Sequence, residues 1–256
     1  MSDVPQCRFV WYDLMTTDTE QGKAFYTTLF GWGTQAWDGP MVYDMWTNQG
    51  TPMGGIMELP EDARRGGAPA HWLAYIGVED LEAAVASAKS LGGTVLVDLT
   101  EIPSAGAFAV LADPQGAAFA MYLSGADSPT PVGKPQVGDV SWHELATTDY
   151  EGAFAYYHAL FGWEKGEPMD VDDAGVYQPF HCAGMGGGMF NKPDEMPGPP
   201  FWLYYVKVDD IDQSVAKVRE LGGHVVNGPM DVPGGDKVAQ CVDPQGAAFA
   251  MHWARD

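Results

Sequence analysis

Alternating apolar and polar residues open the chain and predict a strand from Phe9 to Met15, with a helix directly after it. Thr17 or Asp18 can cap the start of that helix, because a side-chain oxygen at this position accepts an orphan backbone N–H. The helix carries apolar residues at spacings of three and four, and Gly31 ends it. Two strand-like stretches follow, over residues 41–48 and 53–59. We interpret these elements as one β-α-β-β-β module, in which the pattern locates three of the four strands.

The same order of elements then repeats. A strand over 71–78 precedes a helical stripe that Gly92 and Gly93 end, and strands are expected over 94–98, 108–112 and 117–123. Residues 140–253 run through the whole order a second time. We therefore expect four modules, arranged as two similar halves.

Sequence repeats support the division into halves. Asp-Pro-Gln-Gly-Ala-Ala-Phe-Ala-Met occupies 113–121 and again 243–251, and Leu-Phe-Gly-Trp occupies 29–32 and 160–163. The offset is 131 residues from Asp18 to Asp149 and 130 from Asp113 to Asp243. We expect a first domain over 5–124, a linker rich in Ser, Pro, Thr and Gly over 125–138, and a second domain over 139–254.

The amino-acid composition narrows the range of possible partners and locations. Thirteen Lys and Arg against 35 Asp and Glu give a net charge of −22, which repels nucleic acid and anionic membrane surfaces. The chain start lacks the features of a signal peptide, and no apolar run approaches the ~20 residues of a membrane span. Cys7, Cys182 and Cys241 show no metal-ligand spacing. We expect a cytoplasmic protein in which all three are reduced thiols.

Taken in order, these motifs resemble the vicinal oxygen chelate superfamily, the group of glyoxalase I, bleomycin resistance proteins and extradiol dioxygenases. The likeness rests on a strand ending Thr-Thr-Asp, a helix ending Phe-Gly-Trp, a strand ending Val-Glu-Asp-Leu or Val-Asp-Asp-Ile, a helix ending Leu-Gly-Gly, and the Asp-Pro-Gln-Gly turn. It covers nearly the whole chain twice and looks most like two-domain glyoxalase-like proteins of bacteria. The implied fold is α+β, with tandem glyoxalase-like domains. Each would contain two βαβββ modules forming a curved, cleft-bearing sheet with helices on its outer face.

The resemblance also implies where metal ligands would stand in metal-using relatives. Those positions are occupied by Trp11, Leu73 and Ala120 in the first half and by Trp142, Leu203 and Ala250 in the second. None of these side chains can ligate a metal ion, which needs imidazole, carboxylate or thiolate donors. We therefore predict that the protein uses no cofactor.

Polar groups two residues from these positions are expected to line the same clefts, because strand side chains alternate between faces. They are Asp13, His71, Tyr75 and Tyr122 in the first half and Glu144, Tyr205 and His252 in the second, where Phe201 replaces the first histidine. Trp11 and Trp142 either stack on a planar or apolar ligand or fill the clefts. The leading prediction is a monomer or homodimer that binds a small organic molecule for resistance, sensing or carriage.

Two alternatives stay open. One is an enzyme, a lyase, isomerase or dioxygenase, in which Glu144 and His252 are catalytic, with or without a divalent metal. A metal there would need a third donor, and His143 should instead face the helices. The other alternative is a structural protein whose clefts are filled by tryptophan. Trp72 and Trp202 are expected on the helix-facing side, as core residues.

Overall fold

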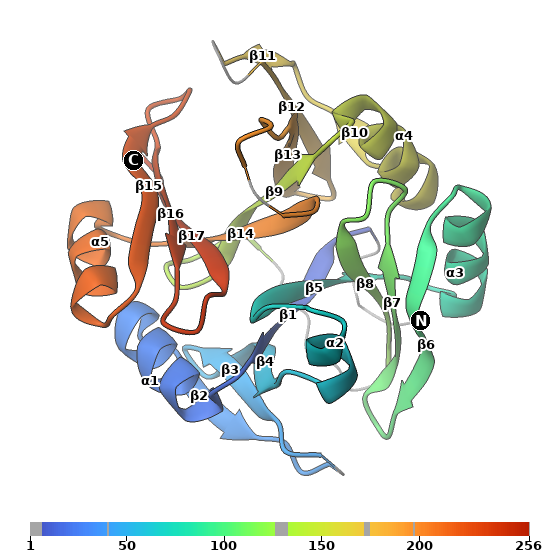
Figure 1. The fold of residues 1–256 in the computed structure, drawn as a ribbon, viewed down its shortest axis with the longest axis horizontal. Coiled ribbons are helices and arrows are strands. Elements are labelled where there is room, and N and C mark those ends of the chain that lie inside the picture. Colours follow the sequence, from blue (N-terminus) through green and yellow to red (C-terminus); the bar gives the residue numbers. More distant parts are fainter. Residues whose placement is uncertain (1–6, 40, 126–132, 172–174, 197, 256) are drawn as a thin grey trace. The chain divides into compact units, whose positions relative to one another are not determined.

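The computed structural model describes residues 7–39, 41–125, 133–171, 175–196 and 198–255 (Figure 1). The part of the expected linker from 126 to 132 lies outside the described residues. The elements form the four expected βαβββ modules, so the chain has an α+β fold. The strand and helix boundaries predicted from the pattern agree with the structure to within a few residues for most elements.

The first half of the chain contains two modules and a short helix between them. The first module is β1 (Phe9–Thr16), α1 (Thr19–Phe30), β2 (Gly33–Ala36), β3 (Asp44–Asn48) and β4 (Thr51–Glu58). Helix α2 (Glu61–Arg65) follows. The second module is β5 (His71–Gly77), α3 (Leu81–Ser90), β6 (Thr94–Ile102), β7 (Gly106–Ala112) and β8 (Ala118–Ser124).

The second half repeats this order. Its first module is β9 (Val140–Thr147), α4 (Tyr150–Phe161), β10 (Glu164–Lys165), β11 (Met169–Asp170), β12 (Val176–Cys182) and β13 (Met185–Asn191). The last module is β14 (Phe201–Lys207), α5 (Ile211–Glu220), β15 (His224–Asp231), β16 (Lys237–Val242) and β17 (Ala248–Trp253).

The chain divides into two compact units that combine modules from different halves. Unit 1 contains residues 1–10, 74–132 and 143–202, which hold most of the second and third modules. Unit 2 contains residues 11–73, 133–142 and 203–256, which hold most of the first and fourth modules. Within unit 1 the strands follow the orders β5-β8-β7-β6 and β10-β12-β13-β9, and within unit 2 the orders β2-β3-β4-β1 and β14-β17-β16-β15. In unit 2 helix α1 packs against α5, and in unit 1 helix α3 packs against α4.

Aspartate begins each of the four long helices. Asp18, Asp80, Asp149 and Asp210 each accept a hydrogen bond from the backbone N–H three residues ahead. Each carboxylate thereby satisfies one orphan N–H and lies at the positive end of the helix dipole. Gly31 and Gly162 end α1 and α4 in the left-handed conformation, at φ 72° and 70°, which a residue without a Cβ adopts at little cost.

A buried tyrosine joins the two modules of each unit. In unit 2 the Tyr26 hydroxyl lies 3.1 Å from Asp243 Oδ2, and Trp72 Nε1 donates to the Tyr26 oxygen at 3.0 Å. In unit 1 the Tyr157 hydroxyl lies 3.2 Å from Asp113 Oδ2, and Trp202 Nε1 donates to the Tyr157 oxygen at 3.1 Å. Both tyrosines come from a helix of one half of the chain, and both aspartates come from the Asp-Pro-Gln-Gly turn of the other half.

The carboxylates in these networks are fully engaged. Oδ1 of Asp113 accepts the backbone N–H groups of Gln115, Gly116 and Ala117 at 2.8–3.0 Å, while Oδ2 accepts from Tyr157. Burial nevertheless raises the pKa of Asp113 and of Asp243, against the opposing effect of these hydrogen bonds. Burial also raises the pKa of Tyr26 and Tyr157 well above the ordinary value, so both remain hydroxyl donors.

The cysteines differ from the expectation that all three are reduced. Cys7 and Cys182 form a disulfide within unit 1, with Cα atoms 6.5 Å apart and a sequence separation of 175. The sequence prediction was wrong for this pair because their proximity arises only when β1 and β12 are brought together. Cys241 is a buried free cysteine, and burial raises the pKa of its thiol to about 12.

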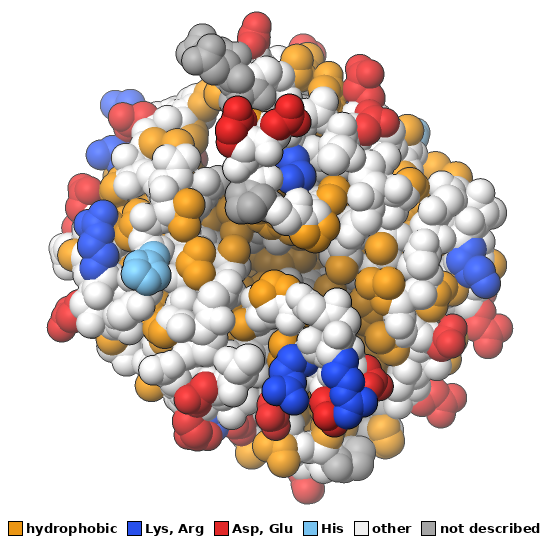
Figure 2. All heavy atoms as spheres, in the orientation of Figure 1, with side chains coloured by type: hydrophobic (Ala, Val, Ile, Leu, Met, Phe, Trp, Pro, Cys, Tyr) orange, Lys and Arg blue, Asp and Glu red, His pale blue; other side chains and the backbone are white. Residues whose placement is uncertain are grey.

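The described residues contain no helix that is both long enough and apolar enough to cross a bilayer. Acidic side chains are more prominent than basic ones over the face shown in Figure 2, as the net charge of −22 requires.

His143 is a core residue of unit 1, and its orientation toward the helices stays a prediction. It is 3% exposed, and its ring stacks on Phe9 with centroids 4.4 Å apart. Its Nδ1 lies 3.0 Å from the carbonyl oxygen of Gly186. Burial lowers the pKa of His143 to about 4, although the hydrogen bond to Gly186 acts in the opposite direction.

We predict that Tyr157→Phe lowers the free energy of unfolding by about 1–3 kcal/mol. The substitution leaves the buried Trp202 Nε1 without its acceptor and removes one donor from Asp113. Tyr26→Phe should have a similar effect in unit 2. Urea denaturation followed by circular dichroism measures the change, with Ser90→Ala at the exposed end of α3 as the control. A loss no larger than that of Ser90→Ala would contradict the assigned role of the tyrosine.

His143 should make stability depend on pH. Because its native pKa is lowered from 6.5 to about 4, the unfolded chain binds a proton at pH values where the native chain does not. The stabilisation is complete above about pH 6.5 and is lost as the pH falls toward 4. Between about pH 7.5 and about pH 5, this one group should account for about 2 kcal/mol. Urea titrations at both pH values should show that His143→Phe loses less stability than the wild type over this interval; equal losses would refute the assignment.

Candidate functional site

A buried carboxylate forms the centre of a polar cluster in unit 2. Asp13 on β1 is 5% exposed, and its Oδ1 accepts hydrogen bonds from the Tyr43 hydroxyl at 2.6 Å and from Trp11 Nε1 at 2.9 Å. Trp11 Nε1 also lies 2.7 Å from the Tyr43 oxygen, so the three polar groups form a triangle. We call Trp11, Asp13 and Tyr43 the Trp–Asp–Tyr cluster. Such charge-assisted hydrogen bonds offset the cost of burying the carboxylate.

Glycine on β4 makes room for this cluster. Asp13 lies opposite Gly55 in the parallel pairing of β1 and β4. A Cβ added at Gly55 would lie 2.1 Å from the ring and hydroxyl of Tyr43, so the tyrosine lies directly on the glycine backbone. The ring of Trp37 contacts Tyr43 from the side, with centroids 6.0 Å apart. The Gly54-Gly55 pair is thus explained by close approach of a side chain.

Unit 1 has a related arrangement from the second half of the chain. Glu144 on β9 lies opposite Gly188 on β13, and a Cβ at Gly188 would lie 2.2 Å from the ring of Tyr177. An acid, a glycine and a tyrosine thus correspond to Asp13, Gly55 and Tyr43. Trp142, two residues before Glu144, corresponds to Trp11 in sequence.

A second polar group lies on β14, β16 and β17 of unit 2. Tyr205 and Gln240 both lie opposite Ala250, and Gln240 Nε2 donates to the Tyr205 hydroxyl at 3.0 Å. His252 lies between two partners, with Nδ1 2.9 Å from Ser141 Oγ and Nε2 3.0 Å from Asp236 Oδ2. The predicted residues Tyr205 and His252 are therefore both held by specific hydrogen bonds.

The corresponding strands of unit 1 carry aromatic residues instead. Tyr75 lies opposite Ala120 and contacts the rings of Phe108 and Tyr122, with centroids 5.9 and 6.5 Å away. The Tyr122 hydroxyl donates to the carbonyl oxygen of Ala105. These two faces, which are equivalent in sequence, have diverged into an aromatic one and a hydrogen-bonded one.

The remaining candidates are placed as follows. His71 Nδ1 lies 2.8 Å from the carbonyl oxygen of Pro69, a local contact at the start of β5. Glu144 belongs to unit 1 and His252 to unit 2, and a joint catalytic role for the two stays a prediction. Trp202 is 6% exposed and Trp72 packs against the buried core of unit 2, which confirms that both tryptophans are core residues.

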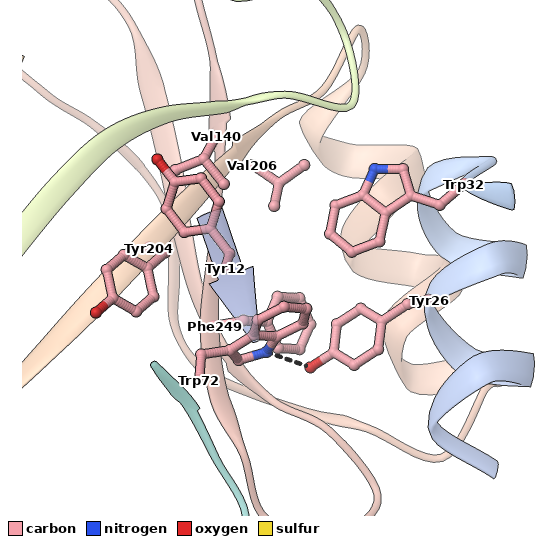
Figure 3. A pocket seen from close by; sticks show the side chains of 8 residues that line it. All are labelled: Tyr12, Tyr26, Trp32, Trp72, Val140, Tyr204, Val206 and Phe249. Carbon is pink, nitrogen blue, oxygen red and sulfur yellow. Dashed lines mark hydrogen bonds between the residues drawn. The ribbon is translucent and has the colours of Figure 1, made fainter. Parts of the chain in front are cut away.

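A small apolar pocket lies in the core of unit 2 (Figure 3). It is lined by Tyr12, Tyr26, Trp32, Trp72, Val140, Tyr204, Val206 and Phe249. Its interior admits about one water molecule, far less than the roughly 300–1,000 Å³ of an ordinary ligand pocket. Val140 occupies the position that Phe9 holds in the first half, and Phe9 stacks on His143 in unit 1. We therefore interpret the pocket as a packing gap beside the smaller valine.

The family model of the Glyoxalase/Bleomycin resistance protein/Dioxygenase superfamily matches residues 8–121 and again 139–251. The chain belongs to this superfamily. The two matches confirm the resemblance seen in the motifs, and with the four modules they confirm tandem glyoxalase-like domains of α+β fold.

Relatives of this glyoxalase-superfamily chain are similar along nearly its full length. A Mycobacterium bovis protein named as a glyoxylase, CFP32, is 34% identical over 248 residues, covering 94% of this chain and 92% of the relative. The anthracycline biosynthesis protein DauV of a Streptomyces species is 32% identical over 259 residues, covering 94% and 91%. The Mn(II)-bound glyoxalase of Novosphingobium aromaticivorans shares the fold, with a TM-score of 0.66 at 16% identity, over 100% of this chain and 84% of that one.

The residues at the superfamily's ligand positions do not fit a metal ion. Trp11, Leu73 and Ala120 have no donor atom that binds a divalent cation, and neither do Trp142, Leu203 and Ala250. Across the described ranges, no group of three His, Cys, Asp or Glu side chains is arranged to hold a metal.

Several site residues were missed from the sequence. Tyr43 precedes β3 and Tyr177 lies within β12, and the spacing of these strands differs between the halves, so comparison of the repeats did not align the two tyrosines. Ser141 and Asp236 have no polar counterpart in the first half, where Val10 and Gly106 stand. The useful signal was the glycine pairs, because a strand glycine marks close approach of another group.

We expect Gly55→Ala to displace Tyr43 from Asp13. The new methyl group would overlap the end of the tyrosine ring, which can swing away, so we predict a modest loss of about 1–3 kcal/mol. Near-ultraviolet circular dichroism should show the changed environment of the aromatic rings, and urea denaturation gives the energy. Gly66→Ala is the control, since its φ is −72° and the nearest atom to the new Cβ is 3.3 Å away. An unchanged aromatic spectrum in Gly55→Ala would contradict the placement of Tyr43.

Proposed function

We propose that this protein binds a small, planar organic molecule that carries hydroxyl or carbonyl oxygens, and does so without a metal. The observation that carries the proposal is the Trp–Asp–Tyr cluster, in which a buried carboxylate and a phenol lie beside an indole ring. An aromatic ring provides a stacking surface for a planar ligand. A carboxylate and a phenol hold polar groups of a ligand in a defined orientation.

The residues at the superfamily's metal positions support a metal-independent function. A metal ion at these positions would orient an oxygenated ligand by coordinating its oxygens. Here the same part of β1 carries Trp11 next to Asp13, so hydrogen bonding would replace coordination. Resistance, sensing and carriage are all compatible with binding of this kind.

The relatives support an aromatic ligand. DauV and the Streptomyces peucetius protein DnrV, which is 31% identical over 256 residues, are both named for anthracycline biosynthesis. Anthracyclines contain planar, hydroxylated rings, which match the combination of indole, carboxylate and phenol in the cluster. We extend this to the present chain as a ligand class, not as a pathway.

The cytoplasmic location remains a prediction. Disulfides rarely persist in a reducing compartment, so the Cys7–Cys182 pair weighs against that location.

Titration with 1,4-dihydroxyanthraquinone, a planar hydroxylated probe, tests the proposal. We expect saturable quenching of tryptophan fluorescence and a matching calorimetric signal. Asp13→Asn and Tyr43→Phe should each weaken binding by about tenfold or more, since a hydrogen bond to a charged group is worth about 1.5–3 kcal/mol. Prior dialysis against a chelator should leave the affinity unchanged.

The control is Asp98→Asn, an exposed carboxylate on β6. It should bind as the wild type does. Absence of saturable binding, equal affinity in Asp13→Asn and Asp98→Asn, or loss of binding after chelation would each count against the proposal.

A further inference from the structure

Ser141, His252 and Asp236 form a continuous hydrogen-bonded chain within unit 2. Ser141 Oγ lies 2.9 Å from His252 Nδ1, and His252 Nε2 lies 3.0 Å from Asp236 Oδ2. The other carboxylate oxygen, Oδ1, accepts the backbone N–H of Arg255 at 2.9 Å. The serine comes from β9, the histidine from β17 and the aspartate from the turn before β16.

The charge on Asp236 determines which nitrogen of His252 donates to the carboxylate. Burial acts to raise the pKa of Asp236, but hydrogen bonds from Arg255 and His252 outweigh it, so the pKa is lowered from its ordinary value. An ionised carboxylate only accepts hydrogen bonds, which requires that Nε2 of His252 carries the proton. In the neutral imidazole, the lone pair of Nδ1 then faces Ser141, whose hydroxyl can donate to it. The carbonyl oxygen of Tyr205, at 3.3 Å, is the more distant acceptor for the same hydroxyl.

All three residues of this hydrogen-bonded chain lie in the second half of the sequence. At the offsets of 131 and 130 that relate the halves, Ser141 corresponds to Val10, His252 to Tyr122 and Asp236 to Gly106. Val10, Tyr122 and Gly106 could not form a similar hydrogen-bonded chain. The architecture of the domain therefore does not by itself require a serine, a histidine and an aspartate here.

The three side chains of this hydrogen-bonded chain are partly exposed. The side chains of His252 and Asp236 are 16% and 33% exposed, and Ser141 is half-buried. A base held by a carboxylate and hydrogen-bonded to a hydroxyl is the arrangement that activates serine as a nucleophile. The two ring nitrogens are exchanged relative to the usual triad, in which Nε2 faces the serine. Either nitrogen of a neutral imidazole is a competent base when the other carries the proton.

We propose that Ser141 is an activated nucleophile and that unit 2 cleaves carboxylic esters by acyl transfer to it. His252 is the base, and Asp236 is a positioning residue that fixes its tautomer. The proposal does not depend on the ligand proposed for the Trp–Asp–Tyr cluster, and it gives His252 partners other than Glu144.

The reaction balances with water as the co-reactant. A bond forms between Ser141 Oγ and the acyl carbon while the hydroxyl proton moves to His252 Nδ1. The ester C–O bond breaks, and the alcohol leaves with that proton. Water, deprotonated by the same nitrogen, then attacks the acyl-serine, releases the carboxylic acid and restores the Ser141 hydroxyl.

The test is labelling of the intact protein with a fluorophosphonate. Attack by Ser141 forms an O–P bond and expels fluoride, so we expect one adduct by mass spectrometry, located on the peptide that contains Ser141. Hydrolysis of p-nitrophenyl acetate, followed by release of nitrophenol, supplies a rate.

Substitutions distinguish a loss of the reaction from a loss of folding. Ser141→Ala should abolish the adduct. His252→Gln should slow labelling by about a hundredfold or more, the usual effect of losing a positioned base. Asp236→Asn should also slow labelling, because the tautomer of His252 is then no longer fixed. The pH dependence of labelling should change in Asp236→Asn, which a purely structural role for Asp236 would not produce. Ser214→Ala is the matched control, because Ser214 is a half-buried serine of unit 2 that donates to the Asp210 carbonyl. It should label like the wild type.

Thermal unfolding of every variant shows which ones are folded. The proposal is overturned if the folded wild type gives no adduct under conditions that label a known serine esterase, or if the adduct lies on another residue. It is equally overturned if folded His252→Gln labels at the wild-type rate.

Discussion

The buried hydrogen bond from a helix tyrosine to the aspartate of an Asp-Pro-Gln-Gly turn is the interaction on which the rest of the structure depends. Each aspartate uses one oxygen to organise its own turn and the other to accept from a tyrosine more than forty residues away in sequence, 44 for Tyr157 and 217 for Tyr26. A tryptophan from a third segment completes the network. Because an unsatisfied polar group in such a core is costly, the three segments must meet in one arrangement. The modules of a unit are thereby fixed in register.

This constraint places the functional candidates. β1 contains Trp11 and Asp13 and leads directly to Asp18, the cap of the helix that supplies Tyr26. β17 contains His252 and begins just after the turn that contains Asp243. The strands that carry the candidate groups are thus the strands held by the tyrosine networks. The scaffold is nearly the same in both units, while the side chains that it carries differ, being aromatic around Tyr75 and hydrogen-bonded around His252.

Much of the fold could be predicted from the sequence because its signals are local. Aspartate caps, the left-handed glycines and the periodicity of apolar residues depend on neighbours within a turn or two, and they located the modules. Strand β2 was missed because its four residues are exposed, include no large apolar side chain and pair only with β3. The disulfide and the Ser141–His252–Asp236 chain were missed for a related reason. The disulfide and the Ser141–His252 contact each join segments that are more than a hundred residues apart in sequence. Only the His252–Asp236 contact is closer in sequence. Asp13 and His252 were identified as candidates, but their partners Tyr43 and Ser141 required the structure.

The assembly of each unit from modules of both halves has a consequence for how such a chain could arise. A polypeptide with one half alone would hold one module of each unit and would lack the residues that complete either tyrosine network. It could form them only by exchanging modules with a second copy. Gene fusion of two such copies would make an intermolecular exchange intramolecular, which replaces a concentration-dependent association by a tethered one. Once the copies were joined, each could acquire substitutions independently of the other. A hydrogen-bonded chain such as Ser141–His252–Asp236 could then arise in only one of them.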